Sequence, residues 1–206
     1  KSELISATTF YKQIKNPINL AQTRGSSGIF QYANTGEKAN VFGIELETRL
    51  NLIENEDEKS ILNFNANLTQ MWFNQDLLEN FQYKNIKESN LQGASDFILN
   101  SSLSYNSQKE KAFIATLTGN YSSDKIYALG SPEDFSNSAI LYNDEIIEKG
   151  FVTMDLVVSK KLNEKLVLKF VGRNLLNPAI EQTQLVRDIN TEVETNQTVL
   201  SYKKGS

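Results

Sequence analysis

Residues 42–50 read FGIELETRL, and the alternation in this stretch decides the fold class. Side chains at every second position of a β-strand share one face. The apolar positions are Phe42, Ile44, Leu46 and Leu50. The charged positions between them are Glu45, Glu47 and Arg49. A period of two with full charges on one side predicts a strand with one face in water and one face in an apolar environment.

The same alternation recurs along the chain and predicts further strands. They lie at residues 3–14, 38–50, 60–73, 96–106, 111–127, 150–160 and 164–174, with an eighth beginning near 198. Short polar connections lie at 51–59, 107–110 and 161–163. Long connections lie at 15–37, 74–95, 128–149 and 175–197. Because short and long connections alternate strictly, every long one emerges at the same end of the sheet, which is typical of bacterial outer-membrane barrels. The sequence therefore predicts an all-β fold, an antiparallel up-and-down transmembrane β-barrel segment.

Composition excludes several classes of protein. A net charge of −4 gives no electrostatic case for nucleic-acid binding. The chain has no Cys and no His, which removes thiol chemistry, Cys/His zinc sites and His-dependent nucleophiles. We expect no catalytic residue, metal or cofactor. The first residues, Lys1 to Leu4, lead directly into a strand pattern without a signal peptide, so a barrel protein of this kind would have to be a processed product or an internal piece.

Aromatic side chains lie where the predicted strands meet their connections. These residues are Trp72, Phe73, Phe97, Tyr105, Phe113 and Phe151. Aromatic girdles at both membrane interfaces would place them there, although aromatic residues favour strands in any case.

Several strings resemble one family. NTGEKANVFGIELE at 34–47 is similar to the beginning of a strand in the barrels of TonB-dependent outer-membrane receptors. GRNLLNP at 172–178 looks like their penultimate strand running into a turn, and SYKKG at 201–205 is similar to the opening of their last strand. SDFILN at 95–100 and LSY at 103–105 fit the same pattern. The resemblance covers essentially the whole chain and only the C-terminal third of such a receptor.

The resemblance implies a function. Residues 1–206 would be seven or eight strands at the C-terminal end of a barrel of about 22 strands, without the plug domain and the N-terminal strands. The whole receptor would take up a scarce nutrient across the outer membrane, energised by the TonB system. Its partners would be the plug and the other strands of the same receptor, the TonB complex through the missing N-terminal part, and outer-membrane lipid. A surface lipoprotein is a further partner that the resemblance allows.

Charged residues on the polar faces are expected to face the barrel lumen. They are Glu45, Glu47, Arg49, Asp155, Lys169 and Arg173. Glu45 and Glu47 lie about 7 Å apart on one face, a spacing that also suits a pair of acid and base groups. A hydrated wall paired with neighbouring basic residues is the alternative. Asp155 is the charge inside an otherwise apolar strand, and it is either a plug or substrate contact or a wall residue paired across strands.

Aromatic residues in the long connections are the candidate ligand contacts, as the resemblance implies for extracellular loops. They are Phe81, Tyr83, Tyr127, Phe135 and Tyr142. Packing of one loop against another is the alternative role.

Two other classes of protein stay open at this stage. A soluble β-sandwich or adhesin-like binding module would also need two-faced strands. An outer-membrane enzyme would need a nucleophile or an acid pair, and here only Glu45 and Glu47 could supply one.

Overall fold

The computed structural model describes residues 3–22, 29–55, 59–84, 86–107, 112–131, 144–187 and 193–205. The strands are β1 (Leu4–Lys15), β2 (Ile18–Gln22), β3 (Phe30–Asn34), β4 (Lys38–Asn55), β5 (Ser60–Asp76), β6 (Glu88–Ser89), β7 (Phe97–Ser107), β8 (Phe113–Ser122), β9 (Lys125–Ala128), β10 (Ile146–Glu148), β11 (Phe151–Asn163), β12 (Leu166–Gly172), β13 (Ala179–Arg187) and β14 (Glu194–Lys203). The one helix of the described residues is a 3₁₀ turn, η1 (Glu79–Phe81). The fold class is therefore all-β, as the alternation predicted.

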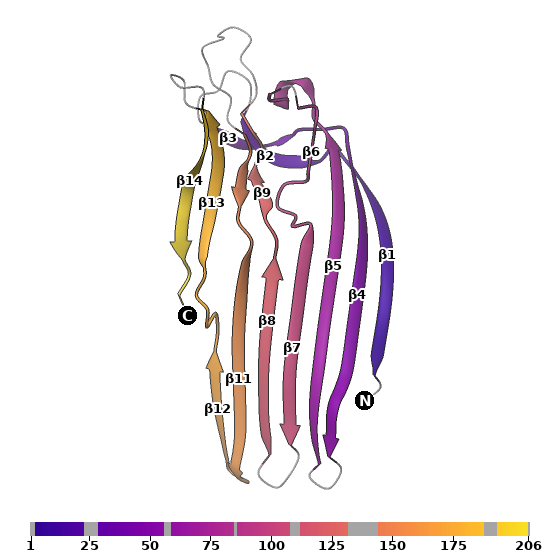
Figure 1. Ribbon diagram of the computed structural model, residues 1–206, viewed down its shortest axis with the longest axis vertical. Helices are drawn as coiled ribbons and strands as arrows, with labels where there is room; N and C mark the ends of the chain where they lie inside the picture. The colour runs from indigo at the N-terminus through magenta and orange to yellow at the C-terminus, as the bar shows by residue number, and fades with distance from the viewer. Residues whose placement is uncertain are drawn as a thin grey trace.

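Long antiparallel strands form a single curved wall (Figure 1). Its order is β1-β4-β5-β7-β8-β11-β12, and every neighbouring pair is antiparallel. We call these seven strands the wall. The path ends at β1 and β12 and does not close within the described residues. The architecture is consistent with a segment of a larger up-and-down barrel, in which closure removes the open edges.

Strands β4 and β5 are 18 and 17 residues long. At about 3.3 Å per residue each extends well over 50 Å, whereas about 9–11 residues suffice to cross a bilayer. These strands are therefore longer than a crossing of a bilayer requires. In Figure 1, β4 ends and β5 begins at the lower end of the wall, as do β7 and β8 and then β11 and β12, whereas β2, β3, β6 and β9 lie at the upper end. This arrangement agrees with the predicted segregation of short and long connections.

Further strands gather at the upper end. A four-stranded sheet has the order β14-β13-β10-β9, and β2 pairs with β3 in a separate hairpin. In Figure 1, β9 continues above β8, and β13 continues above β12. The second sheet is thus an extension of the wall beyond a break in its strands.

Several predicted boundaries differ from the structure by a few residues, and three departures are larger. The predicted strand 111–127 is divided into β8 and β9, because Ser123 and Asp124 leave the ladder between them. The predicted loop 175–197 contains β13 and the start of β14. Strand β4 runs to Asn55 instead of ending at Leu50, with a bulge between Asn51 and Ile53.

The long connection 15–37 also holds structure that the alternation did not reveal. Strands β2 and β3 form a hairpin within it, and the connection 74–95 holds η1 and β6. These elements fold back over the upper end of the wall. We call the described residues 17–22, 29–37, 77–95, 125–131 and 144–149 the loop cap.

Candidate functional site

The strand register lines up apolar side chains across one face of the wall. One row consists of Leu46, Leu68, Leu99, Tyr121 and Val152. A second row consists of Leu50, Phe64, Leu103, Leu117 and Leu156. Residues directly opposite each other in a ladder share a face. Although large and apolar, Leu46, Leu103 and Leu117 are exposed, so this face has no protein covering within the described residues.

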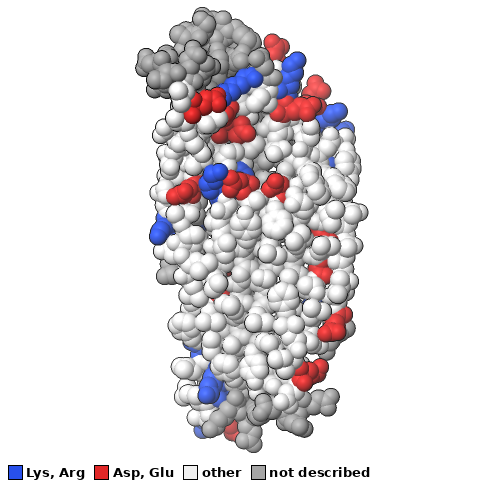
Figure 2. All heavy atoms as spheres, in the orientation of Figure 1, with Lys and Arg blue, Asp and Glu red and all other residues white. Residues whose placement is uncertain are grey.

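Aromatic residues border this apolar face. Phe42 stacks on Trp72 at 5.5 Å near the upper end, and Tyr105 lies 6.1 Å from Phe113 near the lower turns. Leu62 and Trp72 are ten residues apart on β5, about 33 Å along the strand. With a strand tilt of about 40°, this corresponds to a band about 25 Å tall, the height of the apolar band of outer-membrane barrels. Figure 2 shows a face with charged side chains over its upper end and a mostly uncharged middle.

Two aromatic residues do not join this border. Phe73 and Phe151 lie an even number of positions from Asn67 and Thr153, which face the other way. The predicted girdle was therefore wrong for Phe73 and Phe151. The alternation already implies this, because Phe73 is adjacent to Trp72 and Phe151 lies two positions from Thr153.

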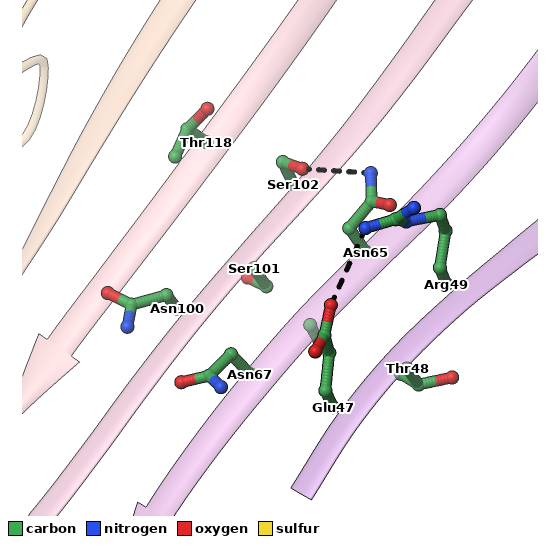
Figure 3. Close-up of a pocket in the computed structure, with 10 residues that line it drawn as sticks. Glu47, Thr48, Arg49, Asn65, Asn67, Asn100, Ser101, Ser102 and Thr118 are labelled. Carbon is green, nitrogen blue, oxygen red and sulfur yellow. Dashed lines mark hydrogen bonds and ion pairs between the residues drawn. The ribbon is translucent and has the colours of Figure 1, made fainter. Parts of the chain in front are cut away.

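Polar side chains line up on the opposite face of the wall. One row consists of Glu47, Asn67, Asn100, Asn120 and Thr153. The next consists of Arg49, Asn65, Ser102, Thr118 and Asp155. Six of the residues that line a hollow of about 250 Å³ between these rows are Glu47, Arg49, Asn65, Asn67, Asn100 and Ser102 (Figure 3). Amides and hydroxyls dominate this hollow, and the charges of Glu47 and Arg49 offset each other across 3.5 Å.

The register also locates the charges predicted to face a lumen. Glu45, Glu47 and Arg49 share the polar face of β4, and Asp155 lies in the Arg49 row. Lys169 pairs with Ser159, four positions from Asp155, and so has the same orientation. Arg173 lies beyond the end of β12. The structure brings Glu47 to Arg49, whereas in the described part of the chain no ion pair joins Glu45 or Glu47 to Lys169 or Arg173. That these charges face a lumen stays a prediction.

Asp155 forms a hydrogen bond to the irregular backbone between β12 and β13. Its Oδ1 accepts a hydrogen bond of 2.7 Å from the backbone N–H of Asn174, where the chain leaves β12 before starting β13. Asn174 and Asn177 both have positive φ, 50° and 42°, which asparagine tolerates better than most residues. Their side chains bind the backbone of Gly205 from both sides: Asn174 Nδ2 donates to its carbonyl, and Asn177 Oδ1 accepts from its N–H. A carboxylate in an apolar strand is thus explained by a backbone donor that the ladder does not satisfy.

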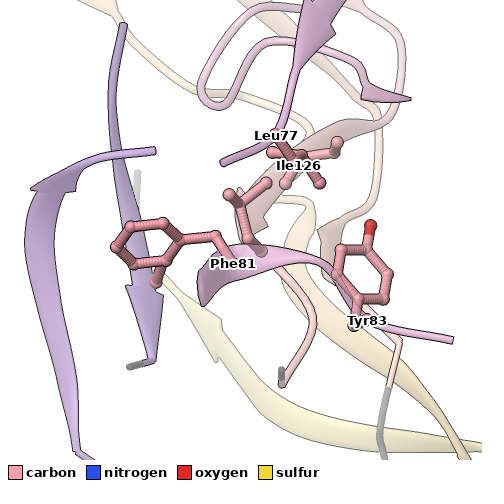
Figure 4. Close-up of a cluster of buried hydrophobic side chains, with 6 residues drawn as sticks. Leu77, Phe81, Tyr83 and Ile126 are labelled. Atoms are coloured by element: carbon pink, nitrogen blue, oxygen red, sulfur yellow. The ribbon is translucent and has the colours of Figure 1, made fainter. Parts of the chain in front are cut away.

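The loop aromatics occupy different surroundings. Phe81 and Tyr83 are buried in a cluster with Ala21, Leu77, Ile126 and Leu129 (Figure 4). Burial leaves little of either ring for a ligand to touch, which agrees with the alternative of loop packing. Tyr127 is 40% exposed and remains accessible. Phe135 and Tyr142 lie outside the described residues.

A network of buried amides joins the loop cap to the wall. Asn19 Nδ2 donates to Gln75 Oε1 at 2.9 Å and to Thr35 Oγ1, and all three residues are buried. Gln75 Nε2 in turn donates to the carbonyl of Asn90. Gln92 Oε1 accepts a hydrogen bond from the Leu20 N–H, and Gln92 Nε2 donates one to the carbonyl of Tyr127. Sequence reasoning missed this network, because no local pattern links residues 56 positions apart.

Tyr83 and Lys84 tie three segments of the upper end together. Tyr83 Oη donates to Glu145 at 2.7 Å, and Lys84 Nζ lies 3.0 Å from both Asp144 and Glu194. Burial, then the Glu145 carboxylate, raises the pKa of Tyr83 far above its ordinary value of 10.0, so the phenol stays a neutral donor. Burial alone would lower the pKa of Lys84, but its hydrogen bonds to Asp144 and Glu194 raise it overall.

Asp124 organises the break between β8 and β9. Its Oδ2 lies 2.8 Å from Lys149 Nζ, and its Oδ1 accepts the N–H of Gly150 at 2.7 Å. Partial burial raises the pKa of Asp124, but the hydrogen bonds from Lys149 and Gly150 outweigh it and lower the pKa below its ordinary value. Ser123 donates to Asp96 and Ser95 to the carbonyl of Ser123, so the break has polar partners.

Two neighbouring hollows lie at the junction of wall and loop cap. One of about 370 Å³ is lined by Phe73, Asp96, Ile126 and Ile147, among others. The other, of about 340 Å³, is lined by Tyr83, Ile86, Glu88 and Ser89, among others. Phe73, Asn90 and Glu145 line both. Within the described residues no group of three or more acidic side chains could hold a metal ion.

The two faces define a class of protein. In the parts of the chain that the structure describes, no helix is long and apolar enough to cross a membrane. An exposed apolar face backed by a polar face is the pattern of a segment of a β-barrel wall. A soluble sandwich would need a second sheet over the apolar face, whereas here the second sheet extends the upper end.

Comparison with known families names the class more closely. The sequence model of a family described as TonB dependent receptor-like, beta-barrel, matches residues 1–175. The chain belongs to this family of TonB-dependent receptor barrels. The family consists of transporters, is not an enzyme family, and is generally found in the outer membrane. Neither the comparison with curated proteins nor that with solved structures finds a match.

Proposed function

We propose that residues 1–206 are the C-terminal part of the barrel of an outer-membrane receptor that takes up a scarce nutrient with energy supplied through TonB. The two-faced wall carries this proposal. A stable strand ladder with an uncovered apolar face needs lipid on that side, and an open ladder needs further strands at its edges. The plug and the remaining barrel strands of the same receptor would supply those partners.

The loops would supply the contact with the nutrient. Tyr127 is the candidate in the described part of the loop cap, since its ring is exposed beside the amide network. Glu45, Glu47, Arg49, Asp155, Lys169 and Arg173 would contribute to a hydrated wall. In this proposal the segment performs no bond-making chemistry. A surface lipoprotein could cover the loop end.

Localisation and fold are tested on the full-length receptor. We expect it in the outer-membrane fraction, with a folded form that migrates faster on gels until it is boiled. Protease should cut within 74–95 and 128–149 and spare the wall strands. Cleavage throughout the strands in detergent would contradict the proposal, and so would a monomer of the 206-residue chain that melts cooperatively in plain buffer.

Transport is tested separately in cells. A strain that lacks the receptor should grow poorly when one nutrient is limiting, and loss of TonB should have the same effect. Uptake that persists at the parental rate without TonB would overturn the energetic part of the proposal. It would leave the localisation intact.

A further inference from the structure

The apolar face of the wall carries a lysine at its lower border. The last row of paired residues on this face consists of Asn55, Ser60, Ser107, Phe113, Lys160 and Leu168. The row above it consists of Ile53, Leu62, Tyr105, Ala115, Val158 and Phe170. Residues directly opposite each other in a ladder share a face, so both rows belong to the apolar face. Lys160 is the charged member of the lower row and therefore lies where the apolar band ends.

A second lysine lies just beyond this border. Lys165 is in the turn between β11 and β12, where its N–H donates to Asn163 Oδ1 at 2.9 Å. Lys160 and Lys165 are both exposed. In the described part of the chain no ion pair joins either ammonium group to a carboxylate, that of Glu164 in the same turn included. Figure 2 shows basic side chains at its lower left, where Figure 1 draws this turn. Both ammonium groups are therefore available to an anion from outside the chain.

Large apolar side chains lie beside Lys160 on the same face. Phe113 and Leu168 are directly opposite it on the strands to either side. Leu168, on the edge strand β12, is 63% exposed. A lysine stem can lie along such an apolar surface while its ammonium group stays at the polar boundary. Cations at the edge of exposed hydrocarbon contacts suit a partner with an anionic head and apolar chains, which is the chemistry of an acidic phospholipid.

We propose that Lys160 and Lys165 bind the phosphate of an anionic phospholipid in the leaflet at the short-turn end of the wall, with its acyl chains against Phe113 and Leu168. This inference rests on the proposed function, since it requires lipid on the apolar face. Charge selects among lipids, because a zwitterionic headgroup carries a cation that the two ammonium groups repel. Each lysine near an anionic membrane surface should contribute a preference of about fivefold.

The test identifies the lipid that stays on the protein. The full-length receptor in a neutral detergent is mixed with equal amounts of phosphatidylglycerol and phosphatidylcholine that have the same acyl chains. Native mass spectrometry then gives the ratio of the two in the first lipid retained. We expect the parent protein to favour phosphatidylglycerol. Lys160→Gln and Lys165→Gln should each lower the ratio about fivefold, and the double variant should lower it further.

Lys169→Gln is the matched control. Lys169 is exposed on the same hairpin, but it lies opposite Ser159 on the polar face. The substitution removes the same charge at almost the same level of the wall, so the ratio should not change. An excess of inorganic phosphate separates a lipid site from a simple anion site. The bound lipid should stay in place, because the free anion cannot replace the contacts of the acyl chains with Phe113 and Leu168.

Three results would overturn the inference. They are a parental ratio in the double variant, an equal loss in Lys169→Gln, and displacement of the lipid by inorganic phosphate. If a variant does not fold, raising the salt concentration in the parent protein should lower the ratio, because screening weakens the attraction between lysine and phosphate. A ratio that does not respond to salt would then count against the inference. A parent protein that retains both lipids equally contradicts this inference alone, whereas one that is monomeric and folded without detergent contradicts the proposed function.

Discussion

The wall and the loop cap are held together by different kinds of contact. In the wall, neighbouring strands exchange backbone hydrogen bonds along long ladders, with a bulge between Asn51 and Ile53, and side chains are left to face two different surroundings. In the loop cap, short strands are held by an apolar cluster around Tyr83 and by a buried amide, Asn19, that binds Gln75 of the wall. The wall consists of long strand ladders and has no buried apolar core of its own. The cap has a small buried apolar core and only short strands. We therefore expect wall substitutions to act through lipid and cap substitutions to act locally.

The largest effect is expected on the apolar face of the wall, which we propose contacts lipid. Leu99→Arg puts a charge in the middle of the apolar rows, and Arg at the bilayer midplane costs about 2–4 kcal/mol in outer-membrane barrels. Asn100→Arg, the next residue on β7, points to the polar face and should cost well under half as much. Unfolding of the full-length receptor by urea in lipid vesicles measures both. Equal losses for the two variants would mean that the faces are not different.

The next largest effect is expected where the chain leaves β12 before it starts β13. Asp155→Leu removes the acceptor of the partly buried Asn174 N–H, which should cost about 1 kcal/mol, the low end of the range for buried donors left unpaired. Asp155→Asn keeps an oxygen at the same place and should lose less than half of that free energy. The same urea titration compares the two. If Asn costs as much as Leu, the charge of Asp155 matters and not its hydrogen bond.

These two sites also show how much of the structure could be predicted from the sequence. The two faces of the wall were predictable because they depend on a period of two between neighbours, as in Glu45 and Leu46. Strand β13 was not, since Ile180 and Gln182 lie two positions apart and are both buried, so no apolar and polar alternation marks it. Asp155 stands out in the sequence as a charge in an otherwise apolar strand. Its partner is a backbone N–H, however, and the residue type does not indicate which backbone group a side chain will bind.

The amide network of the cap was invisible for a further reason. Asn19, Thr35 and Gln75 come from three segments, and each amide alone is typical of an exposed loop residue. The sequence predicts Tyr83 as a ligand contact because it is an aromatic residue in a loop. In the structure it is buried against Gly130 and Glu145. Such contacts depend on how the cap folds over the wall, which no single window of sequence contains.

The next effect is local to the cap and should change the stability of the wall less than the two substitutions above. Gln75→Leu deprives Asn19 of one acceptor and the Asn90 carbonyl of its donor, a loss of about 1–3 kcal/mol confined to the cap. Amide hydrogen exchange of 18–22 and 30–34 should become faster, while β7 and β8 stay protected. Gln70→Leu on the same strand, where the side chain donates to the carbonyl of its neighbour Met71, is the control. Loss of protection in β7 would show that cap and wall unfold together.

The smallest effect lies where the two regions meet, and it depends on pH. The pKa of Asp124 is lower in the folded protein than its ordinary value of 3.8, so its contribution to stability is complete above that value and is lost as the pH falls through the folded pKa. The exposed pair with Lys149 limits the contribution to under about 1 kcal/mol. Lys149→Met should therefore lower the free energy of unfolding at pH 7, and its effect should shrink as the pH falls from 3.8 through the folded pKa. Other acids titrate in both proteins and cancel in this difference, so a penalty that does not shrink in acid would mean that Lys149 acts through packing instead of through Asp124.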